Sequence, residues 1–295
     1  MKNYLNFETD IENLELELEK LKDPFNKEGL SEVDTNKISK IQSEIDLKLE
    51  EIYSNLNAWQ TAMVARHEDR PKSKFFIDNL FNEFIPLSGD RFYGEDKSVL
   101  TGFAKFEGES VLVIGQEKGA DLDSRIERNF GMMRPEGYRK TIRLMKLADK
   151  FNIPIILFID TPGAYPGVGA EERGQAEAIA KSIECCMELK VPTISIIIGE
   201  GGSGGAIALA SSNKVLMLQN AIYSVISPEG CATILWRDPT KTLEAAQAMK
   251  LSAKDLLDLK IIDEIIPEPT GGAHRDKDLI LENVRKSLEK NLDFF

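Results

Sequence analysis

Short apolar runs that alternate with helical segments constrain the fold of this chain more than any other feature. The runs are rich in β-branched residues, none is longer than eight residues, and they span residues 111–114, 153–160, 191–198, 214–218 and 261–266. Between them, residues 135–151 and 170–189 carry apolar side chains at the three- and four-residue spacing of a helix. Buried strands separated by helices are typical of a parallel sheet. The sequence therefore predicts an α/β fold.

The front of the chain differs from the rest in charge and in pattern. Residues 1–56 hold 14 acidic and 7 basic side chains and so contribute −7 of the net charge of −12. Apolar residues recur at helical spacing from Ile11 to Leu21 and from Ile38 to Leu56, on either side of an Asp-Pro break and a short loop. We therefore expect two domains, an N-terminal helical arm over residues 1–60 that folds as a hairpin and an α/β domain over residues 61–295.

Composition argues against several classes of protein. The longest apolar runs stop well short of the ~18 residues that cross a bilayer, so we expect no membrane protein. The acidic first residues lack the apolar segment of a leader, which favours the cytoplasm. A net charge of −12 disfavours nucleic-acid binding, because phosphate groups need a basic surface.

Cysteine and histidine are scarce, which limits metal and nucleophile chemistry. Cys185, Cys186 and Cys231 lack the spacing of a zinc site, so we expect small buried side chains and no metal site. The only histidines are His67 and His274. Any catalytic proposal must therefore work with few imidazole groups.

Two glycine-bearing segments follow buried strands and carry most of the functional information. Residues 160–169 (DTPGAYPGVG) follow one strand, and residues 199–205 (GEGGSGG) follow the next and lead into a helix that begins near Ala206. The carboxyl ends of parallel strands are where open α/β sheets place their ligands. Glycines at a helix start let the backbone approach a ligand, and the unpaired N–H groups there point at it. The pattern predicts a site for a negatively charged oxygen.

Two nucleotide chemistries fit this pattern poorly. Gly199, Gly201 and Gly204 match the G-x-G-x-x-G motif of a dinucleotide site, but no acidic residue stands about 20 residues further on, at 218–220. A phosphate loop requires Lys and then Ser or Thr after Gly204, where this chain has Gly205-Ala206.

Two other chemistries stay open. Residues 201–205 match the G-x-S-x-G motif of a serine hydrolase, with Ser203 as the nucleophile and His274 downstream of it. The other chemistry uses backbone amides alone to stabilise an oxyanion, and each preorganised donor contributes about 3–4 kcal/mol to a transition state. That second chemistry suits a chain with few histidines.

Long motifs at these segments resemble the alpha subunit of the bacterial acetyl-CoA carboxylase carboxyltransferase. The resemblance runs from about residue 75 to residue 290 and is carried by residues 128–140 (RNFGMMRPEGYRK), 158–175 (FIDTPGAYPGVGAEERGQ), 197–210 (IIGEGGSGGAIALA), 223–236 (YSVISPEGCATILW) and 265–275 (IIPEPTGGAHR). It implies a crotonase-like (ClpP/crotonase) spiral of β-β-α units after the N-terminal helical hairpin.

The resemblance implies a carboxyltransferase that works with partners. The expected reaction moves the carboxyl group of carboxybiotin, attached to its carrier protein, to acetyl-CoA and gives malonyl-CoA, the first committed product of fatty-acid synthesis. The expected partners are a carboxyltransferase beta subunit in an α2β2 assembly, the biotin carboxyl carrier protein and biotin carboxylase. The zinc finger of the family belongs to the beta subunit, so no metal is expected in this chain, and biotin is not bound covalently to it.

The resemblance also assigns site residues. The backbone amides of Gly204 and Gly205 match the oxyanion hole that holds the ureido oxygen of biotin, and donors aimed at an oxygen where charge grows lower the barrier. Further substrate-binding candidates are Gly163, Ala164, Gly201 and Gly202. The chain departs from the family pattern at residues 115–119 (GQEKG), where His and Gln are expected before Lys118, and at Ala120, where Arg is common.

A basic segment supplies the last candidates. Residues 125–150 hold eight basic and three acidic side chains, and we expect Arg139 and Arg143 among them to attract a phosphate of coenzyme A or an acidic carrier surface. An assembly subunit whose glycine loops are purely structural is the other class that the sequence leaves open.

Overall fold

The computed structural model of the chain describes residues 3–22 and 35–293, with helices and strands in the predicted alternation. The loop predicted between the first two helices lies outside these residues. The helices are α1 (Thr9–Lys22), α2 (Thr35–Tyr53), α3 (Ala58–Ala65), α4 (Ser73–Leu80), α5 (Leu122–Glu127), α6 (Pro135–Lys150), α7 (Val168–Glu172), α8 (Gln175–Glu188), α9 (Ser203–Ala210), α10 (Pro228–Cys231), α11 (Thr242–Met249), α12 (Ala253–Asp258) and α13 (Lys277–Leu292). The strands are β1 (Asn82–Pro86), β2 (Val99–Phe106), β3 (Glu109–Gln116), β4 (Ile155–Thr161), β5 (Thr193–Gly202), β6 (Lys214–Leu218), β7 (Ile222–Ser224) and β8 (Glu264–Ile266). Short helical turns are η1 (Asn6–Glu8), η2 (Asn129–Gly131), η3 (Ala232–Trp236) and η4 (Pro239–Lys241).

One mixed sheet forms the centre of the molecule. Its strand order is β1-β2-β3-β4-β5-β6-β8, and β7 pairs with the end of β5. The strands from β3 to β8 run parallel, whereas β1, β2 and β3 are antiparallel neighbours. Every residue of β4 and β5 is buried, as their continuous apolar runs predict. The α/β class is confirmed.

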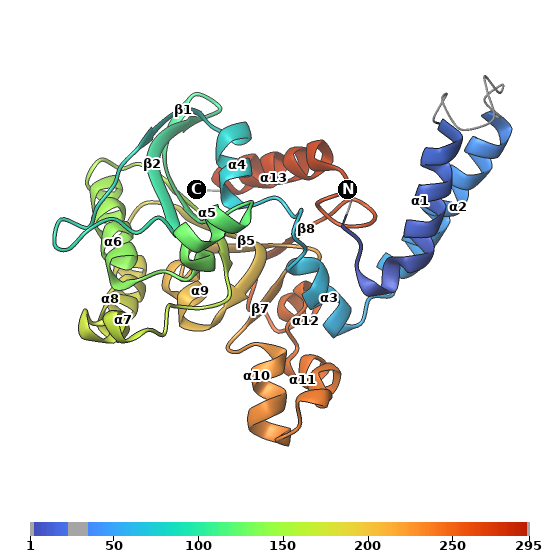
Figure 1. Ribbon diagram of the computed structural model, residues 1–295. Coiled ribbons are helices and arrows are strands. Elements are labelled where there is room, and N and C mark those ends of the chain that lie inside the picture. The colour runs from blue at the N-terminus through green and yellow to red at the C-terminus, as the bar shows by residue number, and fades with distance from the viewer. Residues whose placement is uncertain (1–2, 23–34, 294–295) are drawn as a thin grey trace.

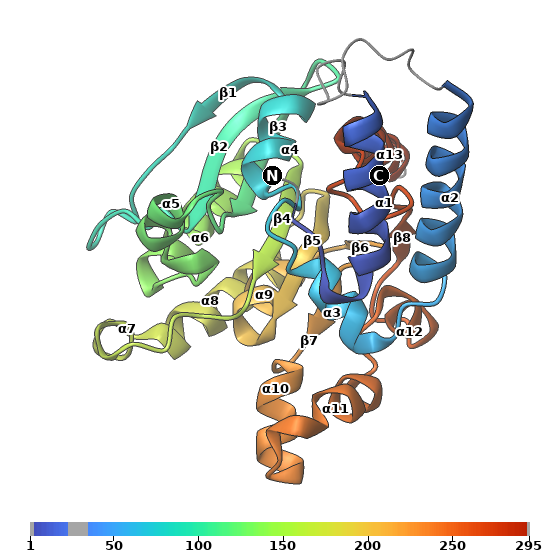
Figure 2. The same ribbon diagram turned by 45° about the vertical axis from the view of Figure 1, so that its right-hand side comes forward.

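Helices cover both faces of this sheet (Figures 1 and 2). On one face α6, α8 and α9 pack against one another, and on the other face lie α4 and α13. A separate lobe made of α10, η3, η4 and α11 projects from the carboxyl edge of the sheet. The lobe exposes apolar side chains, with Ile234, Leu235 and Trp236 at 65%, 70% and 40% exposure.

Three predicted elements differ clearly from the structure in their bounds. The strand predicted over 261–266 is shorter, because β8 covers only Glu264–Ile266. The helix predicted over 170–189 is two helices, α7 and α8, because Gly174 adopts a left-handed φ of 78° between them. The strand predicted to stop at Ile198 continues to Gly202, because β7 pairs with residues 200–202 and extends the ladder. Gly199, Gly201 and Gly202 are therefore strand residues, and the loop predicted there is wrong.

The N-terminal hairpin is confirmed as the pair α1 and α2, which stands beside the body of the molecule (Figures 1 and 2). Its apolar stripe buries Ile11, Ile45 and Leu49 in a core of its own that also takes in Val64 from α3. Arg275 joins the hairpin to the body through Glu8 at 3.0 Å and Glu15 at 2.8 Å. The division into domains at residue 60 stays a prediction, and that residue lies within α3.

All three cysteines are free and buried, as expected. Within residues 3–22 and 35–293, no helix is both long enough and apolar enough to cross a membrane.

The two histidines stack on each other where the hairpin meets the body. The ring centroids of His67 and His274 are 3.8 Å apart and the rings are 11° from parallel. Burial, and then the neighbouring His67, lower the pKa of His274 to about 3, and burial also lowers the pKa of His67. The Nδ1 atom of His274 is buried and has no hydrogen-bond partner among residues 3–22 and 35–293. The stacked pair is therefore neutral at physiological pH.

We expect this pair to make the fold sensitive to acid. In the unfolded chain His274 has a pKa of about 6.5, so it takes up a proton there before it does in the folded chain, and stability is lost as the pH falls below that value. Replacing His274 with Phe keeps a stacking ring and removes the titration. Between pH 7.5 and 5.5 the wild-type chain should lose about 1 kcal/mol more unfolding free energy than His274→Phe, measured by urea denaturation. Equal losses in the two proteins would contradict this.

Candidate active site

The two glycine segments meet at the carboxyl edge of the sheet, as predicted from their positions after neighbouring parallel strands. A Cβ atom added to Gly205 would lie 2.5 Å from the carbonyl carbon of Gly163 and 2.7 Å from the nitrogen of Ala164. A Cβ at Gly202 would collide with the backbone of Pro162. Only glycine allows backbone to touch backbone at this distance. Gly163 and Ala164 therefore lie directly against the start of α9.

The first turn of α9 presents backbone donors at this contact. The N–H groups of the first turn of a helix have no partner inside the helix and lie at the positive end of its dipole. In the described part of the chain, neither Gly204 nor Gly205 donates its N–H to a side chain or to a loop carbonyl. The α9 start therefore offers two free donors beside Gly163 and Ala164.

A cavity of about 420 Å³ opens at Gly204. Its walls are mostly apolar, and it is lined by Ser203, Gly204, Ile207, Tyr223, Ser224, Val225, Met249, Leu256 and Ile261. A Cβ at Gly204 would meet nothing closer than Ile179, at 3.7 Å. Gly201 and Gly202 are buried within β5 instead and do not line this cavity.

Gln116, at the end of β3, bonds to the backbone at the start of α9. Its Nε2 donates to the Gly205 carbonyl oxygen at 2.8 Å, and the side chain is fully buried. Its Oε1 has no hydrogen-bond partner. The Gln116 amide is therefore bound to the backbone of the α9 turn.

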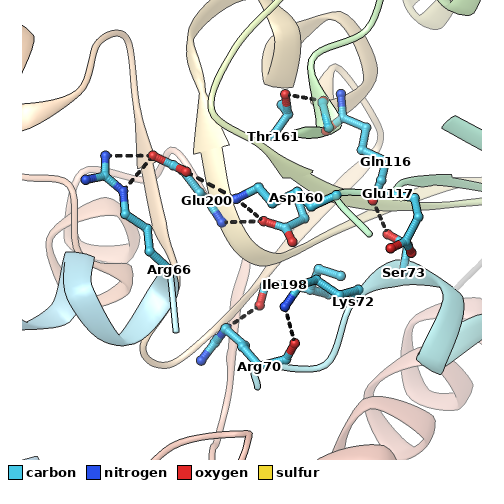
Figure 3. Close-up of polar contacts among 12 residues, drawn as sticks. Arg66, Arg70, Lys72, Ser73, Gln116, Glu117, Asp160, Thr161, Ile198 and Glu200 are labelled. Carbon is cyan, nitrogen blue, oxygen red and sulfur yellow. Dashed lines mark hydrogen bonds and ion pairs between the residues drawn. The ribbon is translucent and has the colours of Figure 1, made fainter. Parts of the chain in front are cut away.

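A group of charges around the buried carboxylates of Asp160 and Glu200 lies at the same edge, and Figure 3 shows these two residues with Arg66. Lys118 Nζ is 2.8 Å from Asp160 Oδ1 and 3.1 Å from Glu200 Oε2. Arg66, which caps the C-terminus of α3, pairs with Glu200 at 2.7 Å and with Glu229 at 2.7 Å. Burial by itself raises the pKa of Glu200, but the charges of Lys118 and Arg66 outweigh it and leave that pKa below its usual range. Lys118, Asp160, Glu200, Arg66 and Glu229 are called the charge cluster below.

Sequence reasoning missed the charge cluster, although part of its signal was present. Asp160 and Glu200 are acidic residues at the carboxyl ends of two neighbouring buried strands. Acidic groups in that position need buried cations, and Lys118 follows the neighbouring strand β3. Arg66 caps a helix and lies 134 residues before Glu200 in the sequence. No local pattern indicates that these two side chains meet.

Arg139 and Arg143 lie elsewhere, on α6, in a cavity of about 380 Å³ that none of the glycines lines. Arg143 Nε donates to the Gly89 carbonyl at 3.2 Å, and Arg139 donates to the Arg173 carbonyl. Lys140 of the same basic segment is buried and pairs with Glu95. Several basic side chains of this segment therefore already contact groups within the protein. That Arg139 and Arg143 attract a phosphate of coenzyme A or an acidic carrier surface stays a prediction.

The hydrolase alternative lacks its base. Ser203 does have the left-handed φ, 52°, of a residue in a sharp turn between strand and helix. However, His274 stacks on His67 and lines a different cavity, between the hairpin and the body. No other histidine exists in the sequence. The dinucleotide motif fails too, because Gly199 and Gly201 belong to a strand and not to a loop.

Across the described ranges, no three His, Cys, Asp or Glu side chains gather in a group that could hold a metal ion.

Sequence comparisons agree on one family. The profile of the family described as "Acetyl co-enzyme A carboxylase carboxyltransferase-like" matches residues 4–295. The acetyl-coenzyme A carboxylase carboxyl transferase subunit alpha of Pelagibacter ubique (strain HTCC1062) is 83% identical over 295 residues, which cover all of this chain and 80% of that protein. The subunit of the same name from Chelativorans sp. (strain BNC1) is 54% identical over 292 residues, covering 98% of this chain and 91% of the relative.

Solved structures share the fold at low sequence identity. Transcarboxylase 12S, in a crystal structure with methylmalonyl-coenzyme A and methylmalonic acid bound, matches with a TM-score of 0.63 at 18% identity, over 78% of this chain and 42% of that chain. The beta subunit of P. aeruginosa geranyl-CoA carboxylase matches with a TM-score of 0.59 at 17% identity, over 81% of this chain and 44% of that one. The chain thus spans less than half the length of these structures. The predicted crotonase-like architecture is confirmed.

Proposed function

Because this chain belongs to the alpha-subunit family of the acetyl-CoA carboxylase carboxyltransferase, we propose that the backbone amides of Gly204 and Gly205 bind the ureido oxygen of carboxybiotin during carboxyl transfer to acetyl-CoA. The chain is a carboxyltransferase subunit of acetyl-CoA carboxylase, and the relatives' name, subunit alpha, implies a beta subunit as partner. The residues that carry the reaction, the carrier-bound form of biotin and the α2β2 assembly are parts of the proposal.

The free N–H groups at the start of α9, beside a mostly apolar cavity, are the observation that supports this proposal. A biotin ring is uncharged and largely apolar, with one polar urea edge. Apolar walls beside the donors of the α9 start suit such a ring: Gly204 lines the cavity, and Gly205 follows it in the same turn. Biotin supplies a carboxyl carrier whose ureido oxygen gains negative charge as the carboxyl group leaves. Donors already fixed toward an oxygen of that kind contribute about 3–4 kcal/mol each to the transition state. The amides of Gly204 and Gly205 are fixed because Gln116 and the Gly163 backbone hold the turn.

The rest of the site serves to hold these amides. The contact with Gly163 and Ala164 excludes side chains and water from one side of the turn. The charge cluster sits under the ends of β4 and β5 and balances two buried carboxylates there. Among the described residues that line the cavity there is no side-chain base, so this chain contributes donors and shape and leaves proton transfer to other groups.

We expect Gly204→Val to separate this proposal from a purely structural role of the glycines. The added side chain has open space, so the chain should fold and bind its beta subunit, but it fills the cavity beside the amides. Biotin-dependent decarboxylation of malonyl-CoA by the αβ complex should fall about 10- to 100-fold. The matched control is Gly94→Val, because an added Cβ meets nothing within 4 Å there and Gly94 does not line this cavity. A Gly204→Val complex with normal activity would favour the scaffold role.

The predicted further partners extend the same proposal. A biotin carboxyl carrier protein would bring the ring to the cavity, and biotin carboxylase would load it. Arg139 and Arg143 both donate to neutral carbonyl groups, so a phosphate of coenzyme A or an acidic carrier surface is a suitable partner for these two guanidinium groups.

A further inference from the structure

Ser203 has an unusual backbone for its residue type. It stands in a run of four glycines, yet it is the one residue of the 201–205 segment whose φ is positive, at 52°. A left-handed conformation is strained for a residue with a Cβ, whereas glycine adopts it freely. The chain thus places a serine where a fifth consecutive glycine would adopt the same backbone without strain. Strain of this kind persists where the side chain has a use.

The Ser203 side chain is exposed and its hydroxyl has no protein partner. In the described part of the chain, no hydrogen bond joins its Oγ to any other residue. The residue lines the 420 Å³ cavity together with Gly204. The other serine in that lining, Ser224, already donates its hydroxyl to the Ile226 carbonyl at 2.8 Å. Ser203 therefore brings an uncommitted hydroxyl to a cavity whose walls are mostly apolar.

Nucleophilic chemistry does not explain this hydroxyl. A serine nucleophile needs an adjacent base to take its proton, and both histidines of the sequence stack on each other at the hairpin. The charge cluster cannot serve either, because its carboxylates are engaged with Lys118 and Arg66. What remains for the Ser203 hydroxyl is binding.

We propose that the Ser203 hydroxyl accepts a hydrogen bond from a ring N–H of biotin and so positions the ring whose ureido oxygen the Gly204 and Gly205 amides hold. This inference rests on the proposed function. A urea group carries its N–H donors on either side of its oxygen, so a site that recognises the whole polar edge needs an acceptor beside its donors. Ser203 is the residue that immediately precedes the Gly204 donor on the same turn. The role is specificity for the ring and does not include proton transfer.

The test compares Ser203→Gly and Ser203→Ala with the wild-type chain, each in complex with the beta subunit. Binding of free biotin is measured by equilibrium dialysis without malonyl-CoA, and thermal unfolding is measured on the same samples. We expect the dissociation constant for biotin, and the KM for biotin in malonyl-CoA decarboxylation, to rise about 5- to 10-fold in both variants. The KM for malonyl-CoA should not change. The melting temperature of Ser203→Gly should stay equal to the wild-type value or rise, because glycine relieves the left-handed strain.

Controls separate this inference from the proposed function. Ser211→Ala makes the same chemical change at the other end of α9, where the hydroxyl donates to the Ile207 carbonyl, and should leave biotin binding unchanged. Unaltered biotin affinity in both Ser203 variants, with lost affinity in Gly204→Val, would overturn the role of Ser203 alone. Unaltered affinity in all three would overturn the proposed function as well. A weaker biotin affinity that comes with a lower melting temperature in Ser203→Gly would assign Ser203 a structural role and overturn the proposal.

Discussion

A Gly205→Ala variant should lose carboxyl transfer by about 10²–10³-fold, the cost of removing a donor from an oxyanion hole. The added methyl group would lie 2.5 Å from the Gly163 carbonyl carbon and 2.7 Å from the Ala164 nitrogen. Both are backbone atoms, so the glycine segments must move apart, and the Gly205 amide moves with them. The measurement is kcat for biotin-dependent malonyl-CoA decarboxylation by the complex with the beta subunit.

Gly204→Ala is the matched control for folding in this experiment. Its methyl group would find only Ile179, at 3.7 Å and beyond, so its melting temperature should stay near the wild-type value, whereas that of Gly205→Ala should fall. Circular dichroism and co-purification with the beta subunit show whether Gly205→Ala still folds and assembles. A folded, assembled Gly205→Ala complex whose kcat lies within threefold of wild type would show that the backbone contact does not position a catalytic donor.

Removal of the Lys118 ammonium should destabilise the fold more than any exposed charge change. Lys118→Met leaves Asp160 and Glu200 buried, with Arg66 as their only remaining cation in the charge cluster. Breaking a buried ion pair from one side costs about 3–5 kcal/mol, because an uncompensated charge stays behind. We expect a loss of that size in the unfolding free energy near neutral pH, measured by urea denaturation. The loss should shrink as the pH falls, because protonation of one carboxylate removes the repulsion.

Two comparison variants make the Lys118 result specific. Lys74→Met breaks an exposed pair with Asp78, whose side chains are 60% and 52% exposed, and should cost no more than about 0.5 kcal/mol. Lys118→Met combined with Asp160→Asn removes one negative charge together with the positive one and should recover part of the stability. If Lys118→Met costs less than 1 kcal/mol near neutral pH, the buried carboxylates do not depend on Lys118.

The parallel part of the sheet could be predicted because its signal is local. The strands β3 to β6 are continuous apolar runs, and such runs are buried on both faces. β2 was missed because its burial alternates and a glycine interrupts it, and β7 is only three residues long. The extension of β5 through Gly199–Gly202 depends on pairing with β7. The glycine-rich segment alone does not predict that pairing.

The meeting of the glycine segments was predictable from topology. Parallel strands that are neighbours end at the same edge, so the residues after β4 and β5 had to lie close together. The charge cluster was not predictable in the same way, because Arg66 and Glu229 come from helices outside the sheet. The catalytic roles of Gly204 and Gly205 and the binding roles of Gly163, Ala164, Gly201 and Gly202 stay predictions.

Arg66 is placed so that one guanidinium group joins two parts of the molecule. It bonds Glu200 at the end of β5 and Glu229 at the start of α10, the first helix of the projecting lobe. A tilt of the lobe would have to stretch this bridge or pull on Glu200. Arg66 thus couples the lobe to the strand that leads to Ser203. A displacement of the lobe, whose exposed apolar side chains are Ile234, Leu235 and Trp236, would shift the turn that carries the amides.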